Sequence, residues 1–248
     1  MKILAGTSGY AFKEWKGNFY PKELKDDGML GFYASRFPAV EINNTFYRLP
    51  RENVLRDWAA QVPETFTFAL KASQRITHYA RLKEESATLV DFLLKNTSTL
   101  GKRLGPILFQ LPPNLKKDVD RFRGFLGLLP SDRRYVFEFR HESWFDDEVY
   151  TVMRERDIAM CIAEQDDFHC PVVCTSTWGY LRLHKLDYNE GELVDWARRV
   201  TGQSWNEAYV FFKHDETENG GSGPPAVGTF VRACSANATA SLPRHLQQ

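Results

Sequence analysis

Apolar and polar positions alternate in short segments along this chain, and most of these segments end in a charged or polar residue. The alternation is clearest around Phe66, Phe68 and Leu70, which are separated by smaller or more polar positions. A period of two is typical of a β-strand with one buried face. We expect eight strands, over residues 2–10, 39–47, 65–73, 106–113, 135–141, 158–165, 180–185 and 208–215.

Most of these strands are separated by stretches of helix length with apolar residues at helical spacing. Helices are expected over residues 28–37, 50–59, 84–102, 117–129, 144–155, 190–200 and 225–234. This order predicts a single (β/α)8 barrel, for which 248 residues is a usual length. The stretch between the sixth and seventh strands is poor in helix signals, so we expect an irregular crossover there. One domain over 1–234 and a flexible tail over 235–248 complete the prediction.

Composition narrows the class of protein further. The chain is 43% hydrophobic and 26% charged, as soluble globular domains are, and 32 basic residues balance 32 acidic ones. Zero net charge counts against a general nucleic-acid-binding surface. No apolar run reaches the length of a membrane span, and the chain starts directly with a strand and no signal peptide. We therefore expect a cytoplasmic protein without a membrane partner, and the sequence does not indicate an oligomeric state.

Four cysteines are present, and their spacing does not indicate a disulfide framework. Cys161 falls in a predicted strand and is expected to be a small core residue. Cys170 and Cys174 have a CxxxC spacing beside His169, but a zinc site would need two more ligands nearby. We expect reduced thiols in a surface loop.

Charged residues inside the predicted strands are the main candidates for chemistry. In a barrel of this kind the functional site lies where the strands end. Glu138 and Arg140 are two positions apart and share a face, and Arg182 and His184 repeat that relation. Because burying an unpaired charge is costly, these residues and Glu41 are expected either to pair or to face a ligand. They form either a mixed-charge floor at the mouth of the barrel or a structural ion-pair network.

Proton transfer and ligand binding are assigned from residue type and position. Histidine titrates near neutral pH, and carboxylates accept protons, which gives four catalytic candidates. These are Glu41, Glu138, His141 and His184. Cations would hold an anion, amides and hydroxyls would donate hydrogen bonds, and aromatic rings would stack on a ring of the ligand. The ligand-binding candidates are Ser8, Tyr10, Trp15, Asn43, Tyr47, Lys71, His78, Gln110, Arg140, Trp144, Arg182 and Lys213.

Two further features of the strand ends bear on the ligand. The loop after the last strand carries Lys213, His214, Asp215 and glycines 220, 221 and 223, and such loops often hold phosphate in barrels. Carboxylates and imidazoles that could bind a divalent metal are Glu41, Glu138, His141, Glu164, Asp166 and His184. No tight ligand motif such as HExxH occurs, and the nearby arginines would repel a cation. We therefore favour an anionic ligand, assign no metal ligand and no firm cofactor, and keep a divalent metal as an alternative.

Several long runs resemble a known family. They are GTSGYAFKEWKGNFYP (6–21), VEINNTFYRLP (40–50), FALKASQRITH (68–78), LGPILFQLPP (104–113), FEFRHESW (137–144), WGYLRLHK (178–185) and VFFKHDE (210–216). From about Gly6 to Phe230, the chain resembles the domain-of-unknown-function 72 family, also called YecE-like. The resemblance implies a TIM-like barrel and brings no established activity. One departure is Lys213, because many members carry an amide at the end of this strand.

The leading hypothesis is an enzyme or binder that acts on a small anionic or phosphorylated, ring-containing ligand at the C-terminal face of the barrel. A metal-dependent hydrolase or isomerase acting on nucleic acid or a sugar phosphate is one alternative. A non-catalytic nucleic-acid-binding module is another, with aromatic side chains stacking on bases.

Overall fold

A computed structural model of the chain describes residues 1–165, 168–213 and 223–240. Eight parallel strands make up the sheet: β1 (Lys2–Thr7), β2 (Ala39–Ile42), β3 (Thr67–Lys71), β4 (Leu104–Gln110), β5 (Tyr135–Glu138), β6 (Ala159–Gln165), β8 (Trp178–Leu183) and β9 (Glu207–Phe212). They are hydrogen-bonded in the order β1-β9-β8-β6-β5-β4-β3-β2. An isolated parallel bridge between Ser8 and Glu41 brings the two ends of this order together. The sheet is therefore a nearly closed barrel.

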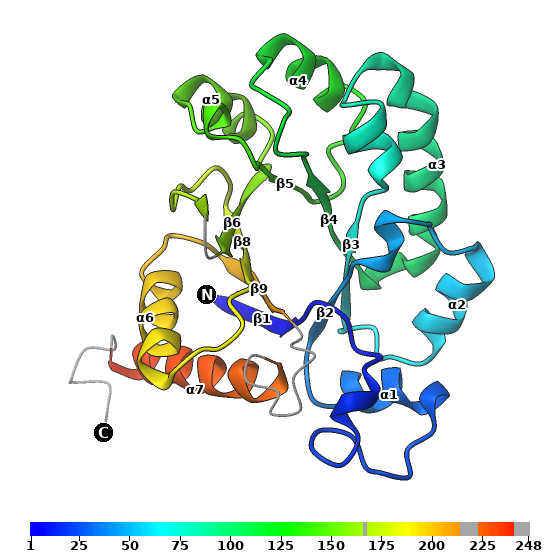
Figure 1. Ribbon diagram of the computed structural model, residues 1–248, viewed down its shortest axis with the longest axis vertical. Helices are drawn as coiled ribbons and strands as arrows, with labels where there is room; N and C mark the ends of the chain where they lie inside the picture. Colours follow the sequence, from blue (N-terminus) through cyan, green and yellow to red (C-terminus); the bar gives the residue numbers. More distant parts are fainter. Residues whose placement is uncertain (166–167, 214–222, 241–248) are drawn as a thin grey trace.

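Helices surround this barrel on the outside (Figure 1). They are α1 (Met29–Ala34), α2 (Glu52–Ala60), α3 (Ala87–Thr97), α4 (Val119–Leu126), α5 (Asp147–Arg154), α6 (Glu190–Thr201) and α7 (Pro224–Ala240). The predicted (β/α)8 barrel is confirmed. Several predicted strands were too long at their carboxyl ends, as after Ile42, where residues 44–46 form a short 3-10 turn.

The crossover between β6 and β8 is irregular, as predicted. No α-helix lies in the part of this connection that the structure describes. Instead, β7 (Phe168–His169) folds back and pairs antiparallel with β6. The chain then returns to the start of β8 through residues 170–177, where the Thr175 hydroxyl donates to the Ile158 carbonyl at 2.8 Å.

The period-two pattern separates an outward core from an inward one. In β5, Phe137 packs outward with the aromatic rings of α4, whereas Val136 faces the barrel interior. The interior is apolar at the amino ends of the strands, and Cys161 is fully buried there, as predicted. Toward the carboxyl ends the inward positions become polar. The strand positions that face the barrel interior are therefore apolar at the amino ends and carry the candidate site residues at the carboxyl ends.

The C-terminal helix is longer than the sequence analysis predicted. Helix α7 runs to Ala240, so residues 235–240 are helical and do not form a frayed tail. The Asn237 side chain donates to the Thr201 hydroxyl of α6 at 3.4 Å, and packing against α6 extends the helix past the buried Cys234. Residues 241–248 lie outside the described part. None of the helices described here combines the length and the apolar character that a membrane crossing requires.

Candidate functional site

A buried arginine joins two buried carboxylates at the carboxyl end of the barrel, which we call the mouth. Glu41 at the end of β2 and Glu138 at the end of β5 are each 0% exposed, and Arg182 in β8 is 4% exposed. Arg182 Nε lies 3.1 Å from Glu41 Oε2, and Arg182 Nη1 lies 2.6 Å from Glu138 Oε2. These strand charges pair with one another, which is one of the two arrangements that the sequence left open.

Glu41 accepts hydrogen bonds from several directions besides that of Arg182. The Ser8 hydroxyl donates to Oε1 at 2.6 Å, the Tyr180 hydroxyl to Oε2 at 2.6 Å, and Asn43 Nδ2 to Oε1 at 3.2 Å. A carboxylate offers about four acceptor positions, so these donors and Arg182 fill them. Sequence reasoning missed Tyr180, although its spacing of two from Arg182 places it on the same inward face.

Glu138 is held as a carboxylate by cations and an amide. Gln110 Nε2 donates to Oε1 at 2.9 Å, and Arg140 forms an ion pair with the same oxygen. Burial alone would raise the pKa of Glu138, but the charges of Arg182 and Arg140 outweigh it and lower the pKa to about 2. Glu138 is therefore ionised at neutral pH and is a weak base.

His184 is connected to Glu41 through Ser8. Its Nε2 lies 3.0 Å from Ser8 Oγ, whose single proton is directed to the Glu41 carboxylate. Ser8 can then only accept from the ring, so Nε2 carries the proton and Nδ1 is left as an acceptor. Burial, followed by the charges of Arg182 and Arg140, holds the pKa of His184 well below its usual range. The half-buried ring is thus neutral, with one basic nitrogen.

Lys71 extends from the end of β3 and lies over an aromatic ring. Its Nζ is 4.2 Å from the centre of the Phe46 ring, and it makes no ion pair within the described residues. Burial, followed by the charge of Arg182, lowers the pKa of Lys71 to about 8, against the opposing effect of the two carboxylates. His78 packs edge-on against the same Phe46 ring, with the two ring centres 5.0 Å apart.

Two tryptophans predicted to bind a ligand lie in hydrophobic cores. Trp144 is 1% exposed, stacks on Phe139 and donates its Nε1 proton to the Leu115 carbonyl at 2.7 Å. Trp15 is 4% exposed and packs among Phe12, Phe19 and Tyr20. These two predictions are corrected, because packing against neighbouring rings leaves neither indole accessible to a ligand.

The remaining candidates lie at the edges of the site or outside the described residues. Tyr47 is 73% exposed at the surface. His141 Nδ1 accepts from the Ser143 backbone at 3.1 Å and so caps the short turn after β5, a structural role that was not predicted. Lys213 is exposed just after β9. His214, Asp215, glycines 220 and 221, and Asp166 fall outside the described residues.

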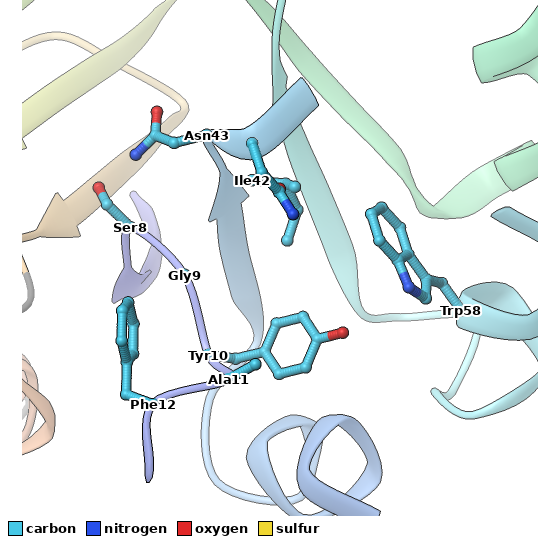
Figure 2. A pocket seen from close by; sticks show the side chains of 9 residues that line it. Ser8, Gly9, Tyr10, Ala11, Phe12, Ile42, Asn43 and Trp58 are labelled. Atoms are coloured by element: carbon cyan, nitrogen blue, oxygen red, sulfur yellow. The ribbon is translucent and has the colours of Figure 1, made fainter. Parts of the chain in front are cut away.

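An aromatic-lined pocket of about 390 Å³ lies next to Ser8 and Asn43 (Figure 2). Phe12 and Tyr10 border it from the loop after β1, and Trp58 borders it from α2. Phe12 and Trp58 were not among the predicted site residues. Trp58 is an ordinary apolar position of helix α2 and Phe12 is one of several aromatic residues in a long loop, so only the tertiary structure identifies them as pocket residues.

The described residues give little support to a metal site or to a paired-cysteine site. Among residues 1–165, 168–213 and 223–240, no group of three or more histidine, cysteine or acidic side chains is arranged to hold a metal ion. Glu164 instead accepts from Tyr188 and from Trp196 Nε1, away from the mouth. Cys170 donates to the Cys161 carbonyl and Cys174 to the Gln203 side chain, so these two half-buried thiols point to different partners. All four cysteines are unpaired, as expected.

Comparison with known proteins identifies the family. The model described as "Protein of unknown function DUF72" matches residues 4–246. The chain belongs to the DUF72 family. It is 24% identical to the UPF0759 protein YunF of Bacillus subtilis over 236 residues, covering 87% of this chain and 80% of YunF. It is 33% identical to YecE of Escherichia coli K12 over 114 residues, which are 46% of this chain and 42% of YecE.

The fold is also that of a solved DUF72 protein. The crystal structure from Thermotoga maritima superposes with a TM-score of 0.76 at 22% identity and covers 95% of this chain and 100% of its own. At this identity the likeness establishes the barrel alone. The DUF72 resemblance expected from the sequence is confirmed, and the function has to be argued from the site.

Proposed function

We propose that this DUF72 protein binds a small anionic, ring-containing ligand at the mouth of the barrel, as a binder or as an enzyme. The observation that carries the proposal is the charge balance of the inward strand ends. Lys71, Arg140 and Arg182 lie with two buried carboxylates, Glu41 and Glu138, which leaves one positive charge in excess at the mouth. Partly buried positive charge attracts an anion more strongly than exposed positive charge does, because water and salt screen the buried charge less.

The pocket beside this charge supplies a place for the ring. Tyr10, Phe12 and Trp58 give it aromatic walls, and Ser8 and Asn43 border both the pocket and the Glu41 network. A ligand with a ring in the pocket and an anionic group at the cations would use both features. Pockets of this size and mixed lining are typical of small-molecule sites.

Within an enzyme, the site favours His184 as the group that exchanges protons. Glu41 and Glu138 were proton-transfer candidates, but their acceptor positions are filled by arginine, amide and hydroxyl donors. Both carboxylates instead hold Arg182, and Glu41 also orients His184 through Ser8. A neutral imidazole can exchange a proton with a ligand hydroxyl, and the charge of a bound anion would oppose the cations that lower the pKa of His184.

The alternatives fit this arrangement less well. A divalent metal at Glu41 and Glu138 would have to displace Arg182 from both carboxylates and would then lie beside its charge. A nucleic-acid-binding module would need a broad basic surface, whereas the chain has zero net charge.

Binding of matched compounds tests the proposal. A panel of ring compounds with and without a phosphate, such as pyridoxine 5′-phosphate with pyridoxine and AMP with adenosine, is titrated by calorimetry. We expect phosphorylated members to bind more tightly, and Lys71→Met and Arg140→Met to weaken binding about tenfold each, or about 1.4 kcal/mol. Lys102→Met, at a side chain that is 80% exposed, is the control and should change nothing.

Three results would count against the proposal. Equal affinity for the charged and uncharged members of every pair would remove the anionic requirement. Unchanged binding in the two mouth variants would move the site elsewhere. Metal-dependent binding, or oligonucleotide binding with a steep dependence on salt, would favour the corresponding alternative.

A further inference from the structure

Lys71 differs from the other mouth cations in its surroundings. The two carboxylates that could pair with it are already saturated, Glu41 by Ser8, Tyr180 and Arg182, and Glu138 by Gln110 and two arginines. The lysine Nζ instead lies over the Phe46 ring, and no acidic side chain in the described residues lies within 4.0 Å of it. Its backbone is fixed, because the Thr45 hydroxyl donates to the Lys71 carbonyl at 2.7 Å.

These surroundings make the uncharged amine more accessible in Lys71 than in an ordinary lysine. Half-burial and neighbouring guanidinium groups both penalise the ammonium form, and they lower the pKa of Lys71 to about 8. At pH 7.5 such a lysine is about one-quarter unprotonated, against about one part in a thousand for an ordinary lysine. An amine in this state is a nucleophile toward carbonyl carbon.

We propose that Lys71 is a nucleophilic lysine that forms an imine with an aldehyde or ketone group of an anionic ligand held at the barrel mouth. This deepens the proposed function and rests on it, because it adds a carbonyl to the ligand class. The amine nitrogen attacks the carbonyl carbon and forms a carbinolamine. The carbinolamine then loses its oxygen as water, with both hydrogens of that water supplied by the original amine.

The mouth also holds the parts that this condensation needs. A proton must leave nitrogen and reach the departing oxygen, and His184 has a neutral ring with a free Nδ1 to carry it. Lys71 and His184 interact through charge across the same mouth, since Lys71 contributes to the lowered pKa of His184. Arg140, which is held at the mouth by Glu138, lies beside the anionic group when the Lys71 amine has become an imine.

Reductive trapping tests the proposal with three matched probes. Pyridoxal 5′-phosphate carries ring, phosphate and aldehyde; pyridoxal lacks the phosphate; pyridoxine 5′-phosphate lacks the aldehyde. The full chain is treated with each probe and cyanoborohydride, and peptide mapping by mass spectrometry gives the labelling rate of every lysine. We expect Lys71 to be labelled by pyridoxal 5′-phosphate at least about tenfold faster than Lys102, whose side chain is 80% exposed.

Two controls define the expected pattern. Pyridoxine 5′-phosphate should slow the labelling of Lys71 but not that of Lys102, and pyridoxal should label Lys71 more slowly than its phosphate does. Lys71→Arg keeps the positive charge and should abolish the fast label while leaving the other lysines unchanged. Because the mapping is done on the wild-type chain, the result does not depend on folding of the variant.

The outcomes separate this inference from the proposed function. Binding of pyridoxine 5′-phosphate without preferential labelling of Lys71 overturns the nucleophilic lysine and leaves the anion site standing. Labelling of Lys71 no faster than Lys102, with no binding of either phosphorylated probe, overturns both. Fast labelling that pyridoxine 5′-phosphate does not slow also overturns the proposal, because the reactive amine would then lie outside the anion site.

Discussion

A single arginine determines the character of the barrel mouth. Arg182 contacts Glu41 and Glu138 through different nitrogens and also donates to the Asn43 side chain at 3.3 Å. Its burial is tolerated because both carboxylates compensate its charge. At the scale of residues, the two carboxylates therefore serve mainly to position Arg182 and the other donors around them. Lys71 and His184 are the groups that can react with a ligand.

The proton on His184 gives a prediction that needs no substrate. Because Ser8 donates to Glu41, His184 should be the neutral tautomer with the proton on Nε2, and its lowered pKa should keep it neutral at pH 7 and above. Side-chain ¹⁵N NMR distinguishes the two tautomers and the imidazolium, and His184→Gln assigns the resonance. Ser8→Ala removes the acceptor, so we expect the two nitrogen shifts to move toward an average.

A conservative variant separates the effect of the Ser8 hydroxyl on the His184 tautomer from an effect of altered packing. Ser8→Thr keeps the hydroxyl and should restore the Nε2-protonated tautomer. A ring protonated on Nδ1 in the wild-type chain, or an imidazolium at pH 7, would contradict the proposed Glu41–Ser8–His184 connection.

At the scale of elements, the closing seam of the barrel depends on a glycine. Gly6 in β1 faces β2, where an added Cβ would lie 2.0 Å from the Ala39 carbonyl oxygen and 2.8 Å from the Tyr33 hydroxyl. Backbone cannot give way as a flexible side chain can. The same seam carries Ser8 and Glu41, so the approach of β1 to β2 also assembles the site.

We therefore expect Gly6→Ala to lower the free energy of unfolding by about 3 kcal/mol or more. Urea denaturation followed by circular dichroism measures it. The matched control is Gly124→Ala in α4, where an added Cβ meets nothing within 4 Å and should stabilise the helix by about 0.5–1 kcal/mol. Equal effects of the two substitutions would show that the seam is not as tight as the structure has it.

At the scale of the whole molecule, the mouth charges should make stability depend on acid pH. The pKa of Glu138 is about 2 in the folded chain and near its ordinary value when unfolded. The unfolded chain therefore binds this proton first as the pH falls. The stability that ionised Glu138 contributes is complete above about pH 4.5 and is lost toward pH 2.

Comparison with Glu138→Gln isolates this contribution. Between pH 6 and 2.5, the wild-type chain should lose on the order of 2 to 3 kcal/mol more unfolding free energy than Glu138→Gln. Urea denaturation at each pH gives both curves. Glu64→Gln, at a side chain that is 65% exposed, should follow the wild-type slope. Parallel curves for wild type and Glu138→Gln would contradict the lowered pKa.

The sequence by itself determined the repeating strands and helices, and it determined which face of each strand carries the candidate site residues. Period-two alternation is local, so it fixes which residues of a strand share a face, as with Glu138 and Arg140 or Arg182 and His184. The same locality explains the irregular crossover, which lacks helix signals in its own residues. The length of α7 was underestimated, because contact with α6 extends it.

Only the tertiary structure decided which inward residues meet. Arg182 and Glu41 are 141 positions apart, and nothing in either segment specifies the other as its partner. Burial of Trp144 likewise depends on the Phe122 ring, which another segment of the chain brings in. Closing the barrel places eight strand ends around one small space, where distances of a few ångströms set charge balance, tautomer and pKa.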